Sequence, residues 1–258
     1  MIIGITGSFG SGKTTVANMF GKYGFKVINA DKLYHGIYNK DKSIRNKIKK
    51  EFGTINRNQL KKIVFNDSKK LKKLNDITHP IIIKEIKKEI SAMIKRFNKK
   101  NSIIKKDYNK KHEKISKKFS VSRKLQNNFP GYSIINKNNV KFTDKKIKNN
   151  YNKKLVIGKN SIENQKNVNI VLDIPLLFEA KTTNLVDKVI VVRCSKKEQI
   201  KRILKKKKYN KTEINQIIKS QMPLKEKIKK ADFVINNKTI KEAEKQVKDV
   251  IKVISEKV

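Results

Sequence analysis

The chain has 258 residues, of which 37% are hydrophobic, and this is enough to bury one substantial core. Its formal net charge of +43 is carried mainly by lysine and comes with many Asn and Ile residues, a combination typical of AT-rich genomes. We therefore expect lysines that fill surface positions rather than a nucleic-acid site.

Cysteine content and hydropathy exclude further classes. The single cysteine, Cys194, excludes an internal disulfide. No apolar run approaches the ~20 residues of a membrane span, and the run at residues 1–5 is too short for a signal-peptide core. We expect a cytoplasmic protein.

The N-terminal third alternates short apolar runs with helical patterns. Residues 2–6 and 26–29 are predicted strands, and residues 14–23 between them are a predicted helix. Helical spacing of apolar residues returns between residues 60 and 74 and again between residues 81 and 94.

Lys and Asn dominate residues 98–167, where the apolar periodicity fades. This stretch has 20 Lys and Arg against 4 Asp and Glu, so it cannot bury enough apolar surface to offset its ordering entropy. We predict a low-complexity, largely disordered insertion, with local elements only around residues 129–132 or 155–157.

Strand patterns resume after the insertion. Residues 168–174 and 188–192 are continuous apolar runs of the kind that a parallel sheet buried on both faces requires. Residues 233–235 are a shorter candidate strand, and apolar positions in residues 243–254 share one face of a closing helix. The order of strands and helices predicts an α/β fold with a parallel sheet.

The sharpest motif is Gly7-Ser8-Phe9-Gly10-Ser11-Gly12-Lys13-Thr14, a P-loop pattern between the first predicted strand and the first predicted helix. Its glycines let backbone amides approach a phosphate, and the helix adds its positive end. Lys13 is placed to reach the β- and γ-phosphate oxygens, and the Thr14 hydroxyl to ligate Mg²⁺ directly. The motif predicts an ATP site with Mg²⁺.

A P-loop leaves the acceptor of the phosphoryl group open. The guanine-reading Asn-Lys-x-Asp pattern of switch GTPases is missing from the sequence, since Asn39-Lys40-Asp41 carries its aspartate one place too early. Asp31 directly follows the second predicted strand, at the sheet edge where ligands bind. Its carboxylate either meets an acceptor hydroxyl or caps the helix that begins at Lys32.

Several specific strings occur in order outside the insertion. They are Ile3-Gly4-Ile5-Thr6-Gly7, Gly10-Ser11-Gly12-Lys13-Thr14-Thr15, Val27-Ile28-Asn29-Ala30-Asp31, Glu51-Phe52-Gly53, Ile77-Thr78-His79-Pro80, Asp173-Ile174-Pro175-Leu176-Leu177-Phe178-Glu179 and Ala231-Asp232-Phe233-Val234-Ile235. Together they resemble one family, the dephospho-coenzyme A kinases. Members transfer the ATP γ-phosphoryl group to the ribose 3′-hydroxyl of dephospho-coenzyme A.

The resemblance implies a P-loop kinase fold, with a parallel sheet flanked by helices, as a single domain over residues 1–258. It implies a helical substrate-binding subdomain inserted at residues 32–97 and a helical lid at residues 196–225. The last strand and the C-terminal helix would occupy residues 226–258. ATP and dephospho-coenzyme A would be the substrates, with Mg²⁺ accompanying ATP. No oligomeric state is predicted.

The resemblance also implies roles for single residues. Asp31 would orient the 3′-hydroxyl and accept its proton, Lys13 would stabilise the transferred group, and Asp173 would support Mg²⁺ through water. The implied ATP-binding residues are Gly7, Ser8, Phe9, Gly10, Ser11, Gly12, Lys13, Thr14, Thr15, Arg202 and Asn237. The implied substrate-binding residues are Asp31, Arg57, His79, Pro80, Pro175, Leu176, Leu177, Phe178 and Glu179.

Some of these residues have a plainer structural interpretation. His79 before Pro80 is also a good cap for a helix start, and the apolar run 176–178 also suits core packing. Arg57 also suits an exposed helix face, and Arg202 a salt bridge within its own helix. We keep both interpretations open at each position.

Besides the insertion and a shorter connection between Phe52 and Arg57, two single residues depart from the family pattern. Asn29 stands where the family has a first aspartate, and Ile217 stands where a lid arginine is expected. The lysine run 205–208 can supply charge there but lacks the planar guanidinium fork.

Two other classes remain as alternatives. One is a P-loop kinase that acts on a different nucleoside or nucleotide. The other is a basic P-loop protein that binds RNA or an anionic membrane through residues 98–167.

Overall fold

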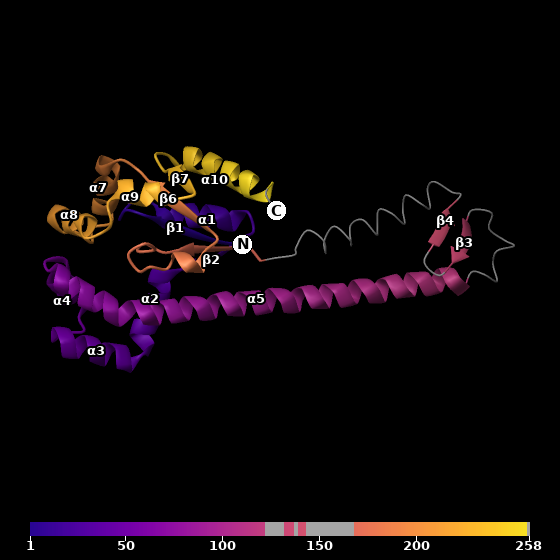
Figure 1. The fold of residues 1–258 in the computed structure, drawn as a ribbon, viewed down its shortest axis with the longest axis horizontal. Helices are drawn as coiled ribbons and strands as arrows, with labels where there is room; N and C mark the ends of the chain where they lie inside the picture. The colour runs from indigo at the N-terminus through magenta and orange to yellow at the C-terminus, as the bar shows by residue number, and fades with distance from the viewer. Residues whose placement is uncertain (122–131, 137–138, 143–167, 257–258) are drawn as a thin grey trace. The chain divides into compact units, whose positions relative to one another are not determined.

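The computed structural model describes residues 1–121, 132–136, 139–142 and 168–256 (Figure 1). Its internal contacts divide the chain into two units, Met1–Ser91 with Asn169–Val258 and Ala92–Val168. All of the residues implied above for catalysis and binding belong to the first unit.

A five-stranded sheet in the order β2-β5-β1-β6-β7 forms the centre of the first unit. The strands are β1 (Ile2–Gly7), β2 (Lys26–Asn29), β5 (Ile170–Asp173), β6 (Lys188–Arg193) and β7 (Phe233–Asn236). Every pairing in this sheet is parallel. The predicted α/β fold with a parallel sheet is confirmed.

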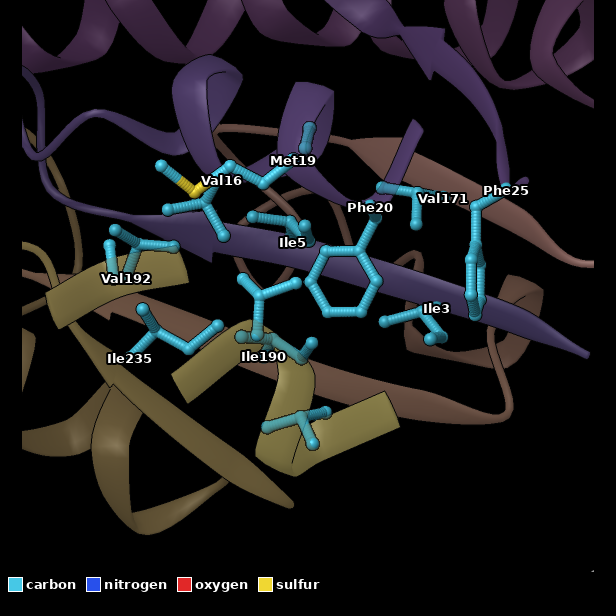
Figure 2. Close-up of a cluster of buried hydrophobic side chains, with 14 of the residues drawn as sticks. Ile3, Ile5, Val16, Met19, Phe20, Phe25, Val171, Ile190, Val192 and Ile235 are labelled. Carbon is cyan, nitrogen blue, oxygen red and sulfur yellow. The ribbon is translucent and has the colours of Figure 1, made fainter. Parts of the chain in front are cut away.

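Helices α1 (Lys13–Lys22) and α10 (Ile240–Ser255) pack against one face of this sheet and complete its core. Figure 2 shows the ring of Phe20, from α1, beside Ile3 and Ile190 of the central strands. Phe20 is fully buried, and burying such a side chain contributes roughly 2 to 3 kcal/mol. The core therefore holds the end of β1, from which the P-loop leaves, firmly against the start of α1.

Four helices follow β2 and surround a second, smaller core. They are α2 (Ala30–Lys40), α3 (Lys42–Phe52), α4 (Arg57–Phe65) and the first part of α5 (Ser68–Val121). The side chains of Asn29, Asp41 and Asn56 cap the first three of them. These helices occupy the segment in which the sequence predicts an inserted subdomain, and its substrate-binding role stays a prediction.

His79 and Pro80 lie inside α5, which begins at Ser68. The interpretation of His79 as the cap of a helix start is therefore wrong. Ile77 and Ile81 pack onto the smaller core on either side of the proline. Their burial outweighs the backbone hydrogen bond that proline cannot make, so the helix continues.

Three helices lie between β6 and β7, namely α7 (Lys196–Leu204), α8 (Lys211–Lys219) and α9 (Leu224–Lys229). Ser195 caps α7, and Asn210 with Glu213 forms a capping box at α8. A short 3-10 turn, η2 (Thr183–Leu185), precedes β6. The segment predicted as a lid thus contains α7, α8 and the start of α9.

In the second unit, α5 continues to Val121 and a hairpin pairs β3 (Tyr132–Asn136) with β4 (Asn139–Phe142). The expectation of disorder is wrong for residues 98–121, which are helical. Of the local element expected around residues 129–132, only Tyr132 lies within the described residues, and β3 begins there. Residues 98–121 contain neither Pro nor Gly, and lysine favours helix, so nothing in them ends α5. The element expected at 155–157 lies outside the described residues. Among the described helices, none combines the length and the apolar character needed to cross a membrane.

Candidate active site

The P-loop joins the carboxyl end of β1 to the first turn of α1. Gly10 and Gly12 adopt left-handed backbone conformations, with φ of 80° and 89°. A Cβ atom on Gly10 would lie 2.6 Å from Ile203 Cδ1, and one on Gly12 would overlap the Asn237 side-chain amide. Only glycine fits this turn, because both the backbone angles and the neighbouring side chains exclude a methyl group.

Lys13 is the buried cation of the loop. Its Nζ donates to the backbone oxygens of Gly7, at 3.1 Å, and Ser8, at 3.0 Å. Burial lowers the pKa of Lys13 from its ordinary value to about 8, although the charges of Asp173 and Asp31 oppose this shift. An incoming phosphate would restore the protonated form of this ammonium.

Asp173 ends β5 beside the P-loop. Its Oδ2 accepts hydrogen bonds from Thr14 Oγ1 and from Asn29 Nδ2, each at 2.6 Å. Its Oδ1 is buried and has no hydrogen-bond partner among the described residues. Burial raises the pKa of the Asp173 carboxyl, and the hydrogen bond from Thr14 and the charge of Lys13 only partly offset this.

Asp31 lies in the first turn of α2 and is exposed. The N-cap of α2 is Asn29, whose Oδ1 accepts from the Lys32 N–H at 2.8 Å. The capping interpretation of Asp31 is therefore wrong, and its carboxylate is left available at the carboxyl edge of the sheet. Its charge helps to set the pKa of both Lys13 and Asp173.

Residues 174–181, the segment after β5, contain the Pro-Leu-Leu-Phe-Glu string. Leu177 is fully buried and faces Gly4 of β1, which supports the packing interpretation for this residue. Pro175, Leu176, Phe178 and Glu179 are only partly buried. The Pro175 oxygen accepts from Thr6 Oγ1 at 3.0 Å, which holds the segment against β1.

An open pocket of about 640 Å³ lies between α5 and this segment. His79, Pro80 and Glu179 line it together with Asp76 and Lys181. Burial lowers the pKa of His79, against the charges of Asp76 and Glu179. The structure therefore brings three of the implied substrate-binding residues to one cavity.

Arg57 does not line that pocket. Its guanidinium contacts both ring nitrogens of His35, with Nη2 3.1 Å from Nε2, and it lies 5.8 Å from the centre of the Tyr38 ring. The side chain is thus held by neighbours in α2 rather than merely solvated.

Arg202 and Asn237 connect the predicted lid to the P-loop. Asn237 Nδ2 donates to the Ser11 oxygen at 2.8 Å. Arg202 Nη2 donates to the oxygens of Asn237 and Lys238, and Arg202 Nε pairs with Glu198 within α7 at 2.8 Å. The salt-bridge interpretation of Arg202 is confirmed, and the same side chain also braces the loop after β7.

Other P-loop residues make contacts that fix the loop. The Phe9 N–H donates to Gln221 Oε1 at 2.9 Å, and the Phe9 ring meets Tyr209 edge-on. Ser8 and Ser11 are buried, and Thr15 is exposed on α1. Ile217, where a lid arginine was expected, is buried in α8 and cannot be replaced there by a solvated charge without loss of packing.

A glycine loop with a buried lysine, set between the central strand of a parallel sheet and the following helix, defines a P-loop nucleotide-binding protein. The family model described as dephospho-CoA kinase matches residues 1–105 and 141–242. The chain belongs to the dephospho-CoA kinase family, and the resemblance read from the sequence is confirmed.

Curated relatives carry the same name. The dephospho-CoA kinase of Carboxydothermus hydrogenoformans is 31% identical over 244 residues, which cover 92% of this chain and 85% of the relative. That of Fusobacterium nucleatum is 32% identical over 248 residues, which cover 92% and 89%. Among solved structures, TT1252 from Thermus thermophilus aligns with a TM-score of 0.57 at 20% identity over 100% of this chain and 97% of that one, a likeness of fold.

Three residues of this region had no role in the sequence prediction. Lys227 is fully buried beside Glu179, Tyr209 contacts Phe9, and Lys61 Nζ lies 4.7 Å from the centre of the Tyr209 ring. Lys227 and Lys61 are two lysines among many, so only their positions in space set them apart. Tyr209 follows the lysine run 205–208. An aromatic residue directly after four lysines was the signal from which it could have been identified.

Gly12→Ala should weaken ATP binding strongly while the protein still folds. The added methyl group overlaps the Asn237 amide and cannot relax at φ of 89°, so the phosphate-facing amides must move. We expect the Kd for ATP, measured by calorimetry, to rise by roughly a hundredfold, as the loss of several phosphate hydrogen bonds implies. Gly36→Ala is the control, because its Cβ would meet open space. Wild-type affinity in Gly12→Ala would contradict the assignment.

ATP binding should take up protons at alkaline pH. The pKa of Lys13 is lowered to about 8 in the free protein, so above pH 8 most of the free protein carries neutral Lys13, and phosphate binding reprotonates it. We expect uptake of roughly half a proton or more at pH 9, and affinity that falls roughly fivefold from pH 8 to pH 9. Calorimetry in two buffers of different ionisation enthalpy measures this uptake. Lys22→Met, at an exposed lysine of α1, should leave it unchanged, and equal uptake at pH 7 and 9 would refute the idea.

Proposed function

We propose that the chain transfers the γ-phosphoryl group of ATP to the ribose 3′-hydroxyl of dephospho-coenzyme A and releases coenzyme A and ADP, the last step of coenzyme A biosynthesis. The supporting observation is the family match across most of the chain, joined to a P-loop that places Lys13 near Asp31 and Asp173. The location of this protein in the cytoplasm stays a prediction.

On the ATP side, the phosphates lie against the P-loop amides at the start of α1. Lys13 turns from the Gly7 and Ser8 oxygens toward the β- and γ-phosphates and neutralises charge that develops during transfer. Arg202 and Asn237 act on the nucleotide through the loop after β7, since their hydrogen bonds hold that loop to Ser11. Ser8, Phe9, Ser11 and Thr15 shape the rest of this site.

The oxygen atoms near the P-loop fit a Mg²⁺ ion that accompanies ATP. Thr14 and Asp173 present hard oxygen donors, and the Asp173 Oδ1 is buried without a partner among the described residues. We assign Thr14 as a direct ligand and Asp173 as a support through water. The ion would neutralise phosphate charge when bound.

On the acceptor side, Asp31 orients the 3′-hydroxyl and accepts its proton. As the hydroxyl oxygen bonds to the γ-phosphorus, the bond from that phosphorus to the β–γ bridging oxygen breaks and ADP leaves. Asn29 cannot take the proton, because its amide is neutral and already bonds Asp173 and Lys32. The transition state is loose, so orientation by Asp31 matters more than strong basicity.

The acceptor itself occupies the surface of α5 and the segment after β5. His79, Pro80 and Glu179 form one wall. Pro175, Leu176 and Phe178, which precede Glu179 in the segment after β5, are assigned to the acceptor by the family resemblance. Leu177 supports this wall from the core. Arg57, braced by His35, adds positive charge for the phosphates of the acceptor.

The test is an acceptor panel with purified protein and γ-labelled ATP. Dephospho-coenzyme A, AMP, CMP and adenosine are offered separately, and we expect label only in coenzyme A. Label in a nucleotide instead would indicate a different P-loop kinase. Transfer to none of them, together with strongly salt-dependent RNA binding, would indicate a basic binding protein.

Asp31→Asn should lower the rate of transfer by roughly 10² to 10⁴, because the amide cannot accept the hydroxyl proton. ATP affinity should stay within about twofold, since Asp31 does not touch the loop amides. Single-turnover kinetics measures the rate, and calorimetry the affinity. Asp41→Asn makes the same chemical change at the N-cap of α3, where Asn caps as well as Asp, and should turn over normally. Near-normal transfer by Asp31→Asn would remove Asp31 from this role.

A further inference from the structure

Lys227 of α9 is a lysine with no exposed surface, buried where a charge is costly. Its Nζ pairs with Glu179 Oε1 at 2.8 Å and donates to the Pro175 oxygen at 3.2 Å. These two partners are the first and last residues of the Pro-Leu-Leu-Phe-Glu string. One ammonium therefore holds both ends of the segment that borders the pocket.

Glu179 has a second hydrogen-bond partner. Its Oε1 also accepts the Met222 N–H at 2.9 Å, and Met222 lies in the connection between α8 and α9. Its other oxygen, Oε2, is buried and makes no hydrogen bond among the described residues. The carboxylate is thus held by one oxygen, while the second is buried and unpaired among the described residues. Glu179 also lines the pocket that contains His79.

Stability alone does not account for this pair. A buried ion pair gains little over apolar side chains of similar volume, because the desolvation of both charges offsets their attraction. A charge in this position is therefore better explained by what it orients than by what it stabilises.

We propose that Lys227 is a positioning residue for the phosphoryl acceptor: it holds Pro175 and Glu179 so that the pocket wall receives the acceptor in register with the P-loop. This inference rests on the proposed function. It also ties the acceptor wall to the end of the predicted lid, because Lys227 and Met222 share Glu179.

The test is Lys227→Met, which keeps the length of the side chain and removes its charge. We expect the KM for dephospho-coenzyme A to rise roughly tenfold or more, as the loss of a charged hydrogen bond implies, while the KM for ATP changes less than about twofold. Lys188→Met is the matched control. It breaks the Lys188–Asp232 ion pair at the start of β6, which is the end of this strand away from the P-loop. Both KM values should remain those of wild type.

A second comparison separates positioning from folding. Glu179→Gln keeps a side-chain oxygen that can accept from Lys227, and the double variant Glu179→Gln with Lys227→Met removes both charges. This comparison therefore remains informative if Lys227→Met alone, which leaves a buried carboxylate unpaired, fails to fold. With Glu179 already neutral, removing Lys227 should raise the acceptor KM only roughly threefold, through Pro175, since interacting residues are not additive. Thermal unfolding of each variant gives its folded fraction.

The outcomes are distinct. An unchanged acceptor KM in folded Lys227→Met, or a kcat that falls only with the folded fraction, would make Lys227 purely structural and overturn the inference. Equal increases in the KM for ATP and for the acceptor would overturn it too. If the wild-type protein formed no coenzyme A, the proposed function would fail first.

Discussion

The buried ammonium of Lys13 is the interaction on which the rest of the site depends. Two backbone oxygens hold it, yet burial still lowers its pKa to about 8, so the protein does not replace all of its lost hydration. In the proposed reaction, phosphate oxygens would complete the set of partners of this ammonium. The left-handed glycines, the helix start and the core around Phe20 serve to keep this one cation where an anion can reach it.

The parallel sheet decides which groups gather around that cation. β1, β2 and β5 end at the same edge, with Asn29 and Ile5 both in register with Asp173. The P-loop, Asp173 and Asp31 therefore lie at the same edge of the sheet. In the chain, both the predicted subdomain (residues 32–97) and the insertion (residues 98–167) separate Asp31 from Asp173. The proposed acceptor wall is built differently, because Glu179 and Lys227 come from segments on either side of the predicted lid.

Local spacing explains what the sequence could predict. The P-loop and the five strands follow from glycine positions and apolar runs, which act over a few residues. Lys227 could not be found this way, since only the fold distinguishes one buried lysine from many exposed ones. The helix-cap interpretation of His79 failed for the same reason. The proline beside it suggests a helix start, but the packing of Ile77 and Ile81 allows α5 to continue through residues 79 and 80.

Asn29 shows how a departure from the family pattern can be accommodated. Its amide has one donor and one acceptor side, and both are used: Nδ2 donates to Asp173 and Oδ1 caps α2 at Lys32. An aspartate there would cap equally well but would turn a second carboxylate toward the buried Asp173 and raise its pKa further. Asparagine removes that repulsion. It also leaves Asp31 as an exposed carboxylate at this strand end, so that in the proposed reaction two different acids would serve the proton and the metal.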